Sequence, residues 1–262
     1  MLPRVTFYLW VLLFSSLPVH AATPPTLLKV PLERGVDCPV YWMPHDSAQA
    51  TLVLFTGGKG GLGYDAMANA PLSPNFLIRS RELFHKKGFN VAIVGRAQDR
   101  ADLDFAYRKS AEHSSDIRAV LLRLQQLAPG ELWLIGTSKG TISAASAAIA
   151  NPDVVAGLVL TSSVVSTGTV GNVPSLEIGK IRIPTLVLHH RKDACKVCQP
   201  ERTKHILAGL ANAPRKQLIV LDGGSGASDN PCEAMHHHGF IGQEAEAVDL
   251  ITSWISGAHE YK

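Results

Sequence analysis

The chain is poor in charged and in aromatic residues, which make up 18% and 6% of its 262 residues. Basic residues outnumber acidic ones by only 25 to 22, and no run of five like charges occurs. The basic stripe of a nucleic-acid groove is therefore not expected. Hydrophobic residues reach 46%, which excludes a disordered chain and leaves enough apolar material for a buried core. Beyond the N-terminal segment no apolar stretch is long enough to span a membrane, so no stable anchor is expected there.

The N-terminal segment has the layout of a secretory signal peptide. Arg4 precedes an apolar run over 5–14, and small residues stand before a cleavage point at Ala22. The apolar run is too short to cross a bilayer as a helix; an uncleaved anchor is the alternative. We predict a signal peptide over 1–21 and a secreted or periplasmic mature domain over 22–262.

Cysteine is also scarce, with Cys38, Cys195, Cys198 and Cys232 in the whole chain. An even number of cysteines in an exported chain favours disulfides, although the sequence does not choose among the three pairings. The spacing of Cys195 and Cys198 also occurs in redox dithiols and zinc sites. A redox dithiol is not favoured, because such a motif normally opens a helix near the start of a βαβ unit. A zinc site is not favoured either, because a four-ligand site would need a second matched pair of ligands.

Six short apolar runs recur at long intervals with little polar–apolar alternation, as strands buried on both faces of a parallel sheet do. They cover 50–55, 89–94, 131–135, 155–160, 183–189 and 217–221, and two weaker candidates at 27–32 and 39–42 would form an antiparallel start. Helices are predicted at 117–127, 141–150 and 247–255, with weaker ones at 76–87 and 200–211. This alternation predicts one α/β domain, a three-layer α/β/α sandwich with a mostly parallel central sheet.

A serine follows one of the predicted strands in a glycine-flanked turn. The strand 131–135 leads at once into Gly-Thr-Ser-Lys-Gly at 136–140, and the small-residue helix 141–150 comes next. G-x-S-x-G between a strand and a helix holds a nucleophilic serine on a sharp turn with its hydroxyl exposed. The helix start also offers free N–H groups to an oxyanion. We predict that Ser138 is the nucleophile; an ordinary glycine-rich turn is the alternative.

A serine hydroxyl needs a general base, and the sequence supplies candidates at the same sheet edge. A glycine-rich loop follows the strand 217–221 and reaches His236, His237 and His238, before Gly239. We choose His238 because Gly239 permits a tight bend that aims its ring. A surface or metal-binding cluster is the alternative, although adjacent histidines on a regular element cannot all face one ion.

The base needs a carboxylate that holds its tautomer and stabilises the imidazolium. Asp193 stands in the loop after the strand 183–189, at the edge where Ser138 is expected. Asp222 at the end of the last strand is the second candidate, and it is less favoured because it lies on the base's own loop. An exposed Asp193 paired with a neighbouring cation is the structural alternative.

The oxyanion needs N–H donors. One should be the backbone of Lys139, directly after the nucleophile, and the other should come from the glycine-rich loop 56–61 after the first central strand. We favour Gly58 as this second donor; the residue on either side of it is the alternative. A hairpin tip or a phosphate loop is the alternative, but the run lacks the Gly-Lys-Ser/Thr ending of a phosphate loop.

On these residues the chain resembles the α/β-hydrolases over nearly all of its mature length. The resemblance rests on the turn around Ser138, on the chain order Ser138, Asp193, His238, and on the glycine loop 57–61. Two features depart from the family pattern. The loop begins Thr-Gly-Gly where many members have His-Gly, and Lys139 occupies the variable position of the turn. The resemblance implies an α/β-hydrolase fold and a serine hydrolase.

Two further expectations concern the loops around this site. A Cys195–Cys232 disulfide would tie the loop of the predicted acid to the loop of the predicted base. The segment 160–183 is too short for a helical cap, so an open site is expected. Lys59 and Lys139 are candidates for attracting an anionic substrate, although solvated surface charges are the commoner case.

The expected activity is hydrolysis of a carboxylic ester or related acyl bond in a small molecule, without a metal or other cofactor. A serine peptidase or acyltransferase is the enzymatic alternative. A non-catalytic binding protein that keeps the fold is another. A third is a metal-binding protein that uses His189, His190 and the histidines 236–238. The oligomeric state is left open.

Overall fold

The computed structural model describes residues 23–168, 170–226 and 228–257, so the predicted signal peptide lies outside the described residues. The strands of the described part are β1 (Thr26–Pro31), β2 (Asp37–Met43), β3 (Thr51–Phe55), β4 (Tyr64–Asp65), β5 (Ala70–Pro71), β6 (Asn90–Val94), β7 (Leu132–Thr137), β8 (Gly157–Thr161), β9 (Thr185–His190) and β10 (Lys216–Leu221). Its α-helices are α1 (Phe76–Arg79), α2 (Arg81–Lys86), α3 (Phe105–Arg108), α4 (Ala111–Leu127), α5 (Gly140–Ala150), α6 (Lys204–Gly209) and α7 (Glu244–Ile255). Short 3₁₀ helices are η1 (Val173–Ser175), η2 (Ile178–Lys180), η3 (Pro200–Arg202) and η4 (His237–Gly239).

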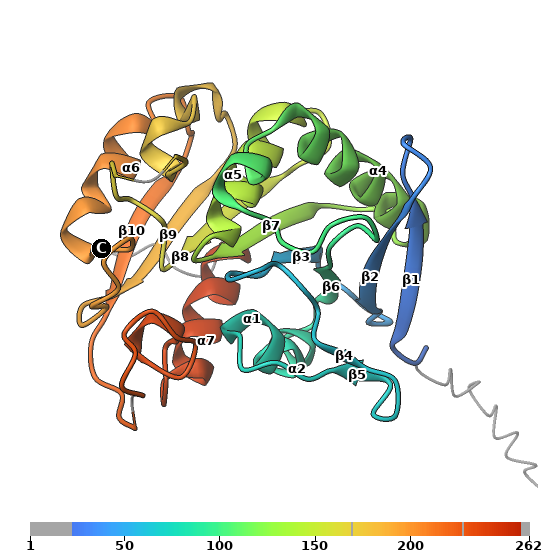
Figure 1. Cartoon of the computed structure of the whole chain (residues 1–262), viewed down its shortest axis with the longest axis horizontal. Coiled ribbons are helices and arrows are strands. Elements are labelled where there is room, and N and C mark those ends of the chain that lie inside the picture. The colour runs from blue at the N-terminus through green and yellow to red at the C-terminus, as the bar shows by residue number, and fades with distance from the viewer. Residues whose placement is uncertain (1–22, 169, 227, 258–262) are drawn as a thin grey trace, which may run out of the picture.

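One eight-stranded sheet forms the centre of the molecule, in the order β1-β2-β6-β3-β7-β8-β9-β10 (Figure 1). The pairs β1–β2 and β2–β6 are antiparallel, and every other neighbouring pair in this sheet is parallel. The predicted mostly parallel sheet with an antiparallel start is therefore confirmed. Because the parallel strands share one direction, the loops after β3, β7, β9 and β10 meet at one edge of the sheet.

Helices cover both faces of this sheet, with α4, α5 and α6 on one side and α1, α2 and α7 on the other (Figure 1). Within β3, Val53 and Phe55 join the buried cluster on the α4–α5 side, while Leu52 and Leu54 join the cluster on the α7 side. Successive strand residues are thus all buried, which explains why the strands read as unbroken apolar runs. The three-layer sandwich predicted from the sequence is confirmed.

Two of the weaker predicted helices are shorter than expected. The segment 76–87 is divided at Ser80, whose ψ of 2° departs from helical geometry and separates α1 from α2. In the segment 200–211, a 3₁₀ turn that begins at Pro200 replaces the first turn, and only α6 is α-helical. The sequence analysis also missed α3 and the small β4–β5 hairpin, both too short for a periodic signal.

No cap domain covers the carboxyl edge of the sheet in the described part of the chain. Between β8 and β9, the described residues 162–168 and 170–184 form only η1, η2 and connecting turns, as the shortness of the segment predicted. Among the described residues, no helix combines the length and the apolar character that crossing a membrane requires.

Candidate active site

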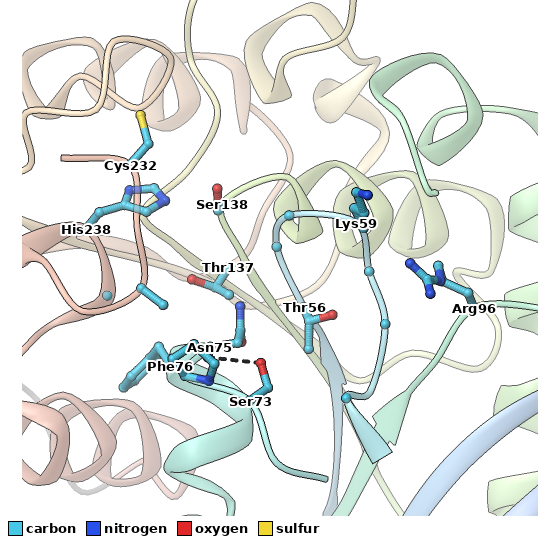
Figure 2. Close-up of a pocket in the computed structure, with 18 residues that line it drawn as sticks. Thr56, Lys59, Ser73, Asn75, Phe76, Arg96, Thr137, Ser138, Cys232 and His238 are labelled. Carbon is cyan, nitrogen blue, oxygen red and sulfur yellow. Dashed lines mark hydrogen bonds between the residues drawn. The ribbon is translucent and has the colours of Figure 1, made fainter. Parts of the chain in front are cut away.

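Ser138 stands on a sharp turn between β7 and α5. Its φ of +54° lies in the left-handed region, which a residue with a side chain rarely adopts. The neighbouring strand and helix hold this strained backbone in place: Ser138 N–H donates to Thr161 O at 3.1 Å, and the Thr141 hydroxyl donates to Ser138 O at 2.6 Å. The turn directs the Ser138 side chain away from the sheet and into a cavity (Figure 2).

The two glycines that flank this turn are required by close backbone packing. A Cβ atom on Gly136 would lie 2.5 Å from Gly140 O, and one on Gly140 would lie 2.0 Å from Phe55 O. Neither contact is possible for a real side chain. The glycines therefore allow α5 to begin directly against β3 and β7, which sets the position of Ser138.

Asp193 and His238 come together from two different loops. His238 Nδ1–H donates to Asp193 Oδ2 at 2.9 Å, and both side chains are buried. Asp222, the other candidate acid, is exposed and pairs with Arg191 at 2.9 Å. The geometry thus places Asp193, and not Asp222, beside the candidate base.

The three consecutive histidines have different surroundings. His238 alone is buried, and the Ser162 hydroxyl donates to its carbonyl oxygen at 2.7 Å. His237 stacks on His190, with ring centroids 4.6 Å apart, and His236 packs edge-on against His237. Only His238 turns inward, on the 3₁₀ turn η4, and the left-handed residue that ends this turn is Phe240, with a φ of +58°. A Cβ on Gly239 would lie 1.8 Å from the backbone oxygen of residue 234.

Asp193 accepts more hydrogen bonds than the one from His238. His189 Nε2 lies 3.3 Å from the same Oδ2 atom, and Cys195 N–H donates to Oδ1 at 3.0 Å. Burial opposes ionisation of this carboxyl. The adjacent imidazoles of His189 and His238 outweigh this effect and lower the pKa of Asp193 to about 2. Asp193 is therefore an anion at neutral pH, as the orienting acid of a histidine base must be.

Ser138 Oγ and His238 Nε2 are not hydrogen-bonded to each other in the described structure. His238 Nε2 is buried and has no partner among the described residues. The Ser138 hydroxyl contacts the thiol of Cys198, a buried side chain whose pKa is raised well above its ordinary value by burial. Serine–base hydrogen bonds are often long in unliganded sites and tighten when substrate binds. The free Nε2 atom is the acceptor that such a step requires.

The glycine-rich loop after β3 packs against the serine turn. A Cβ on Gly57 would lie 2.8 Å from Ser138 Cβ, and Gly58 has a φ of +55°. The N–H groups of Gly58 and Lys139 have no acceptor among the described residues. Two unpaired donors beside a serine are the arrangement that an oxyanion site needs.

A cavity of about 400 Å³ joins these groups. Ser138 and His238 line it together with the glycine loop, and Asn75 and Phe76 at the start of α1 form another wall (Figure 2). The Lys139 side chain does not line the cavity; its Nζ lies over the Phe105 ring, 4.7 Å from the centroid.

The sequence of the chain has no match among family models or curated proteins, but its structure is similar to many solved structures. An esterase of Pyrococcus furiosus is 13% identical with a TM-score of 0.65, over 89% of this chain and 90% of that one. A lidless α/β serine hydrolase of Xanthomonas campestris is 14% identical with a TM-score of 0.60, over 92% and 97%. A predicted hydrolase of Thermoplasma acidophilum is 18% identical with a TM-score of 0.61, over 89% and 98%.

The chain has the α/β-hydrolase fold. At these identities the likeness extends to the fold alone, which is the fold that the sequence resemblance implied. In this α/β-hydrolase fold the candidate site lies at the carboxyl ends of the parallel strands, where open α/β sheets bind their ligands.

One residue that braces the glycine loop was missed by the sequence analysis. Arg108 is only 1% exposed and donates hydrogen bonds to Leu103 O at 2.8 Å, Ser143 Oγ at 2.9 Å and Gly58 O at 3.3 Å. Burial lowers the pKa of Arg108 to about 10, so the guanidinium is still charged at neutral pH. By holding the carbonyl of Gly58, Arg108 fixes the peptides on either side of it.

We expect Arg108→Met to lower kcat for an ester substrate by about 10- to 100-fold, with KM changed less, because a misplaced oxyanion donor weakens transition-state binding more than substrate binding. Steady-state kinetics would measure this split, and Arg108→Lys should be intermediate because it keeps the charge but loses the fork of donors. A change confined to KM, or loss of near-UV circular dichroism, would assign Arg108 a structural role only.

A disulfide joins Cys195 to Cys232, the pair selected in the sequence analysis, while Cys38 and Cys198 are free and buried. Cys195 lies two residues after Asp193, and Cys232 stands in the loop before His238. The disulfide therefore connects the loops of the candidate acid and the candidate base.

Removing this disulfide should loosen that connection. We expect Cys232→Ser to lower the free energy of unfolding by about 2–4 kcal/mol, because the bridge closes a long loop in the unfolded chain, and to lower kcat as the His238 loop gains freedom. Denaturant unfolding and ester hydrolysis would be measured with and without a phosphine reductant. The reductant should shift the wild type toward the variant and leave the variant unchanged. Equal stability of the two proteins without reductant would contradict the expectation.

The metal-binding alternative required several histidines to converge, and the described residues do not bring them together in that way. His189 Nε2 lies 2.7 Å from Cys198 O, and His190 Nε2 lies 2.9 Å from Gln243 Oε1. One other group has ligand atoms within 4.8 Å of one another, namely Cys195, Cys198 and His238. Since Cys195 is in a disulfide, it supplies no thiolate to such a group.

Proposed function

We propose that the protein is a serine hydrolase that cleaves a carboxylic ester or a related acyl bond through an acyl-enzyme. One observation carries the proposal: Ser138, on a strained turn, and His238, whose other ring nitrogen is held by the buried Asp193, line the same cavity. Ser138 Oγ attacks the acyl carbon while His238 Nε2 takes its proton and later returns it to the leaving group. Asp193 holds the Nδ1 proton of His238, and the N–H groups of Gly58 and Lys139 bind the oxyanion.

An ester is favoured over a peptide as the substrate. The cavity is of small-molecule size, and the described chain has no cap domain over it. The similar structures include one called an esterase and one called a lidless serine hydrolase. A peptidase or acyltransferase would use the same groups and is distinguished by its turnover of peptides or by acyl transfer to an added alcohol.

Export is part of the same proposal. The segment 1–21 has the pattern of a cleavable signal peptide, and the Cys195–Cys232 disulfide is typical of proteins in oxidising compartments. Sequencing the N-terminus of the protein recovered from the periplasm or medium would test this, with Ala22 as the expected first residue.

A fluorophosphonate probe tests the catalytic proposal directly. The wild type should be labelled on Ser138 and should hydrolyse short p-nitrophenyl esters, and Ser138→Ala should do neither while keeping its circular dichroism. Ser256→Ala is a matched control, because Ser256 lies after α7 and bonds to Gln49 away from the cavity. An unlabelled wild type without ester turnover would favour a non-catalytic binding protein that keeps the fold.

A further inference from the structure

The charged side chains that line the candidate active-site cavity are all cationic. Two cationic side chains, Lys59 and Arg96, line it, and no carboxylate side chain does so among the described residues. Arg96 lies beyond the glycine loop from His238, and its guanidinium points toward that loop (Figure 2). A concave site with cations and no anions attracts and retains negative groups.

Arg96 has no protein partner in the described part of the chain. It is half-buried, yet it makes no hydrogen bond or ion pair with any described residue. Two other half-buried arginines are paired with carboxylates: Arg34 lies 3.1 Å from Asp116, and Arg79 lies 2.9 Å from Glu244. Arg202 is also half-buried without such a partner among the described residues, but it does not line the cavity. Guanidinium groups held at partly desolvated sites are normally matched by carboxylate or phosphate. The matching group for Arg96 is thus not supplied by the described protein.

The glycine loop is shaped to leave this guanidinium in the cavity wall. A Cβ atom on Gly61 would lie 3.3 Å from Arg96 Cζ and 3.4 Å from Nη2, so the guanidinium rests on the bare Cα of Gly61. The N–H groups of Lys59 and Gly61 have no acceptor among the described residues. Free backbone donors beside a cation are a recurrent anion-binding arrangement.

We propose that Arg96, with the neighbouring N–H groups of the loop, binds a carboxylate of the substrate, so that the enzyme prefers esters whose acyl part ends in a carboxylate. This inference rests on the proposed hydrolase function. The ester carbonyl lies at Ser138 with its oxygen toward Gly58 and Lys139, and the distal carboxylate lies at Arg96. The planar fork of the guanidinium suits a carboxylate in bidentate geometry.

Substrate pairs of equal length test this preference. The 4-nitrophenyl monoesters of adipic and suberic acid would be compared with the same compounds capped as methyl esters, after subtraction of spontaneous hydrolysis. We expect the wild type to show a higher kcat/KM for the anionic member of at least one pair. Arg96→Gln should lower the anionic-to-neutral ratio of kcat/KM by about 10- to 100-fold, the usual effect of losing a hydrogen-bonded charge partner.

A matched variant separates the site from a general effect of charge. Arg123→Gln also removes one positive charge, but Arg123 is exposed on α4, and its one hydrogen bond to a described residue goes to Gln126. It should leave the ratio at the wild-type value. An equal fall of both kcat/KM values in Arg96→Gln would show that Arg96 only supports the loop, and an unchanged ratio would show that it does not bind substrate. Either result overturns the inference.

Ligand binding without turnover keeps the inference separate from the proposed function. Adipate should raise the unfolding temperature of the wild type and of Ser138→Ala, but not that of Arg96→Gln. If no ester is hydrolysed and adipate still stabilises the protein through Arg96, the hydrolase proposal fails and the anion site stands. If adipate has no effect on either parent protein, or inorganic phosphate stabilises them more at equal ionic strength, the carboxylate assignment is wrong.

Discussion

Replacing His238 with alanine is expected to lower kcat for ester hydrolysis by about 10⁴- to 10⁶-fold, the range found when a serine nucleophile loses its base. The physical reason is that Ser138 Oγ then has no acceptor for its proton. His238 Nε2 is the buried nitrogen without a partner among the described residues, and its Nδ1 side is already held by Asp193 at 2.9 Å. Initial rates with p-nitrophenyl acetate would measure the loss, with circular dichroism to check the fold.

His237→Ala is the matched control for this prediction. His237 is adjacent in sequence, but its ring stacks on His190 and not on Asp193, so its loss should change kcat by less than about fivefold, as for a residue that only packs nearby. His236→Ala should be equally mild. A His237→Ala protein as inactive as His238→Ala would show that the base has been assigned one residue too late.

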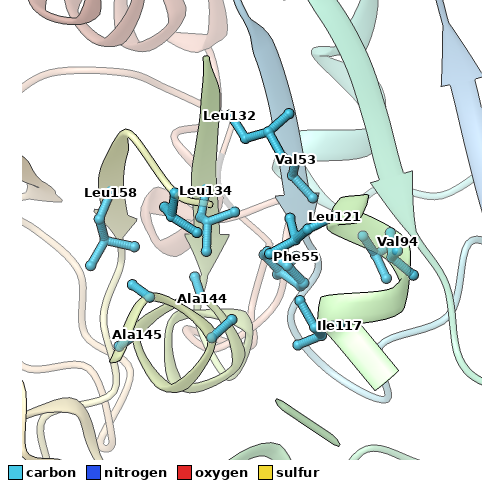
Figure 3. Close-up of a cluster of buried hydrophobic side chains, with 14 of the residues drawn as sticks. Val53, Phe55, Val94, Ile117, Leu121, Leu132, Leu134, Ala144, Ala145 and Leu158 are labelled. Atoms are coloured by element: carbon cyan, nitrogen blue, oxygen red, sulfur yellow. The ribbon is translucent and has the colours of Figure 1, made fainter. Parts of the chain in front are cut away.

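The sequence alone was enough to predict the fold, because both faces of the sheet are covered. Strand residues such as Val53 and Leu134 pack against Ile117 and Ala144 of the helices (Figure 3). Unbroken apolar runs and helical stripes are the direct consequence of that packing. Ends of elements were less well predicted. The strand β7 continues through Gly136, which pairs with Leu160 of β8, although glycine in a sequence reads as the start of a turn.

The candidate triad could be predicted because each of its members follows a recognisable strand. Residues that act through another residue give no such signal. Arg108 reads as one more surface cation, and only the structure shows that it is buried against Gly58. For Arg96 too, only the structure shows that its guanidinium lies against Gly61. His189 carried a weak signal, as a polar residue at the end of a mainly apolar run, but its place 3.3 Å from Asp193 Oδ2 depends on side-chain geometry.

Replacing Asp193 with asparagine is expected to lower kcat by about 10⁴-fold while the protein remains folded. Asp193 Oδ2 accepts from His238, and Oδ1 accepts from Cys195 N–H. An asparagine satisfies the Cys195 donor with its oxygen and then turns its NH₂ group toward His238. Nδ1 must in that case accept a hydrogen bond from the amide, which places the imidazole hydrogen on Nε2 and leaves the base unable to take the proton of Ser138.

Asp222→Asn should keep nearly full activity, because Asp222 is exposed and binds Arg191 and not His238. Equal losses of activity in Asp193→Asn and Asp222→Asn would contradict the assignment of the acid.

The same two variants test the lowered pKa of Asp193. The pKa of Asp193 is about 2 when folded and near 3.9 in an unfolded chain, so its contribution to stability is present above pH 4 and is lost as the pH falls toward 2. That loss is on the order of 2 kcal/mol. Between pH 5 and pH 2 the free energy of unfolding should fall less in Asp193→Asn than in the wild type or in Asp222→Asn, because asparagine has no proton to gain. Other carboxyls with a lowered pKa, such as that of Asp99, keep part of the fall in all three proteins.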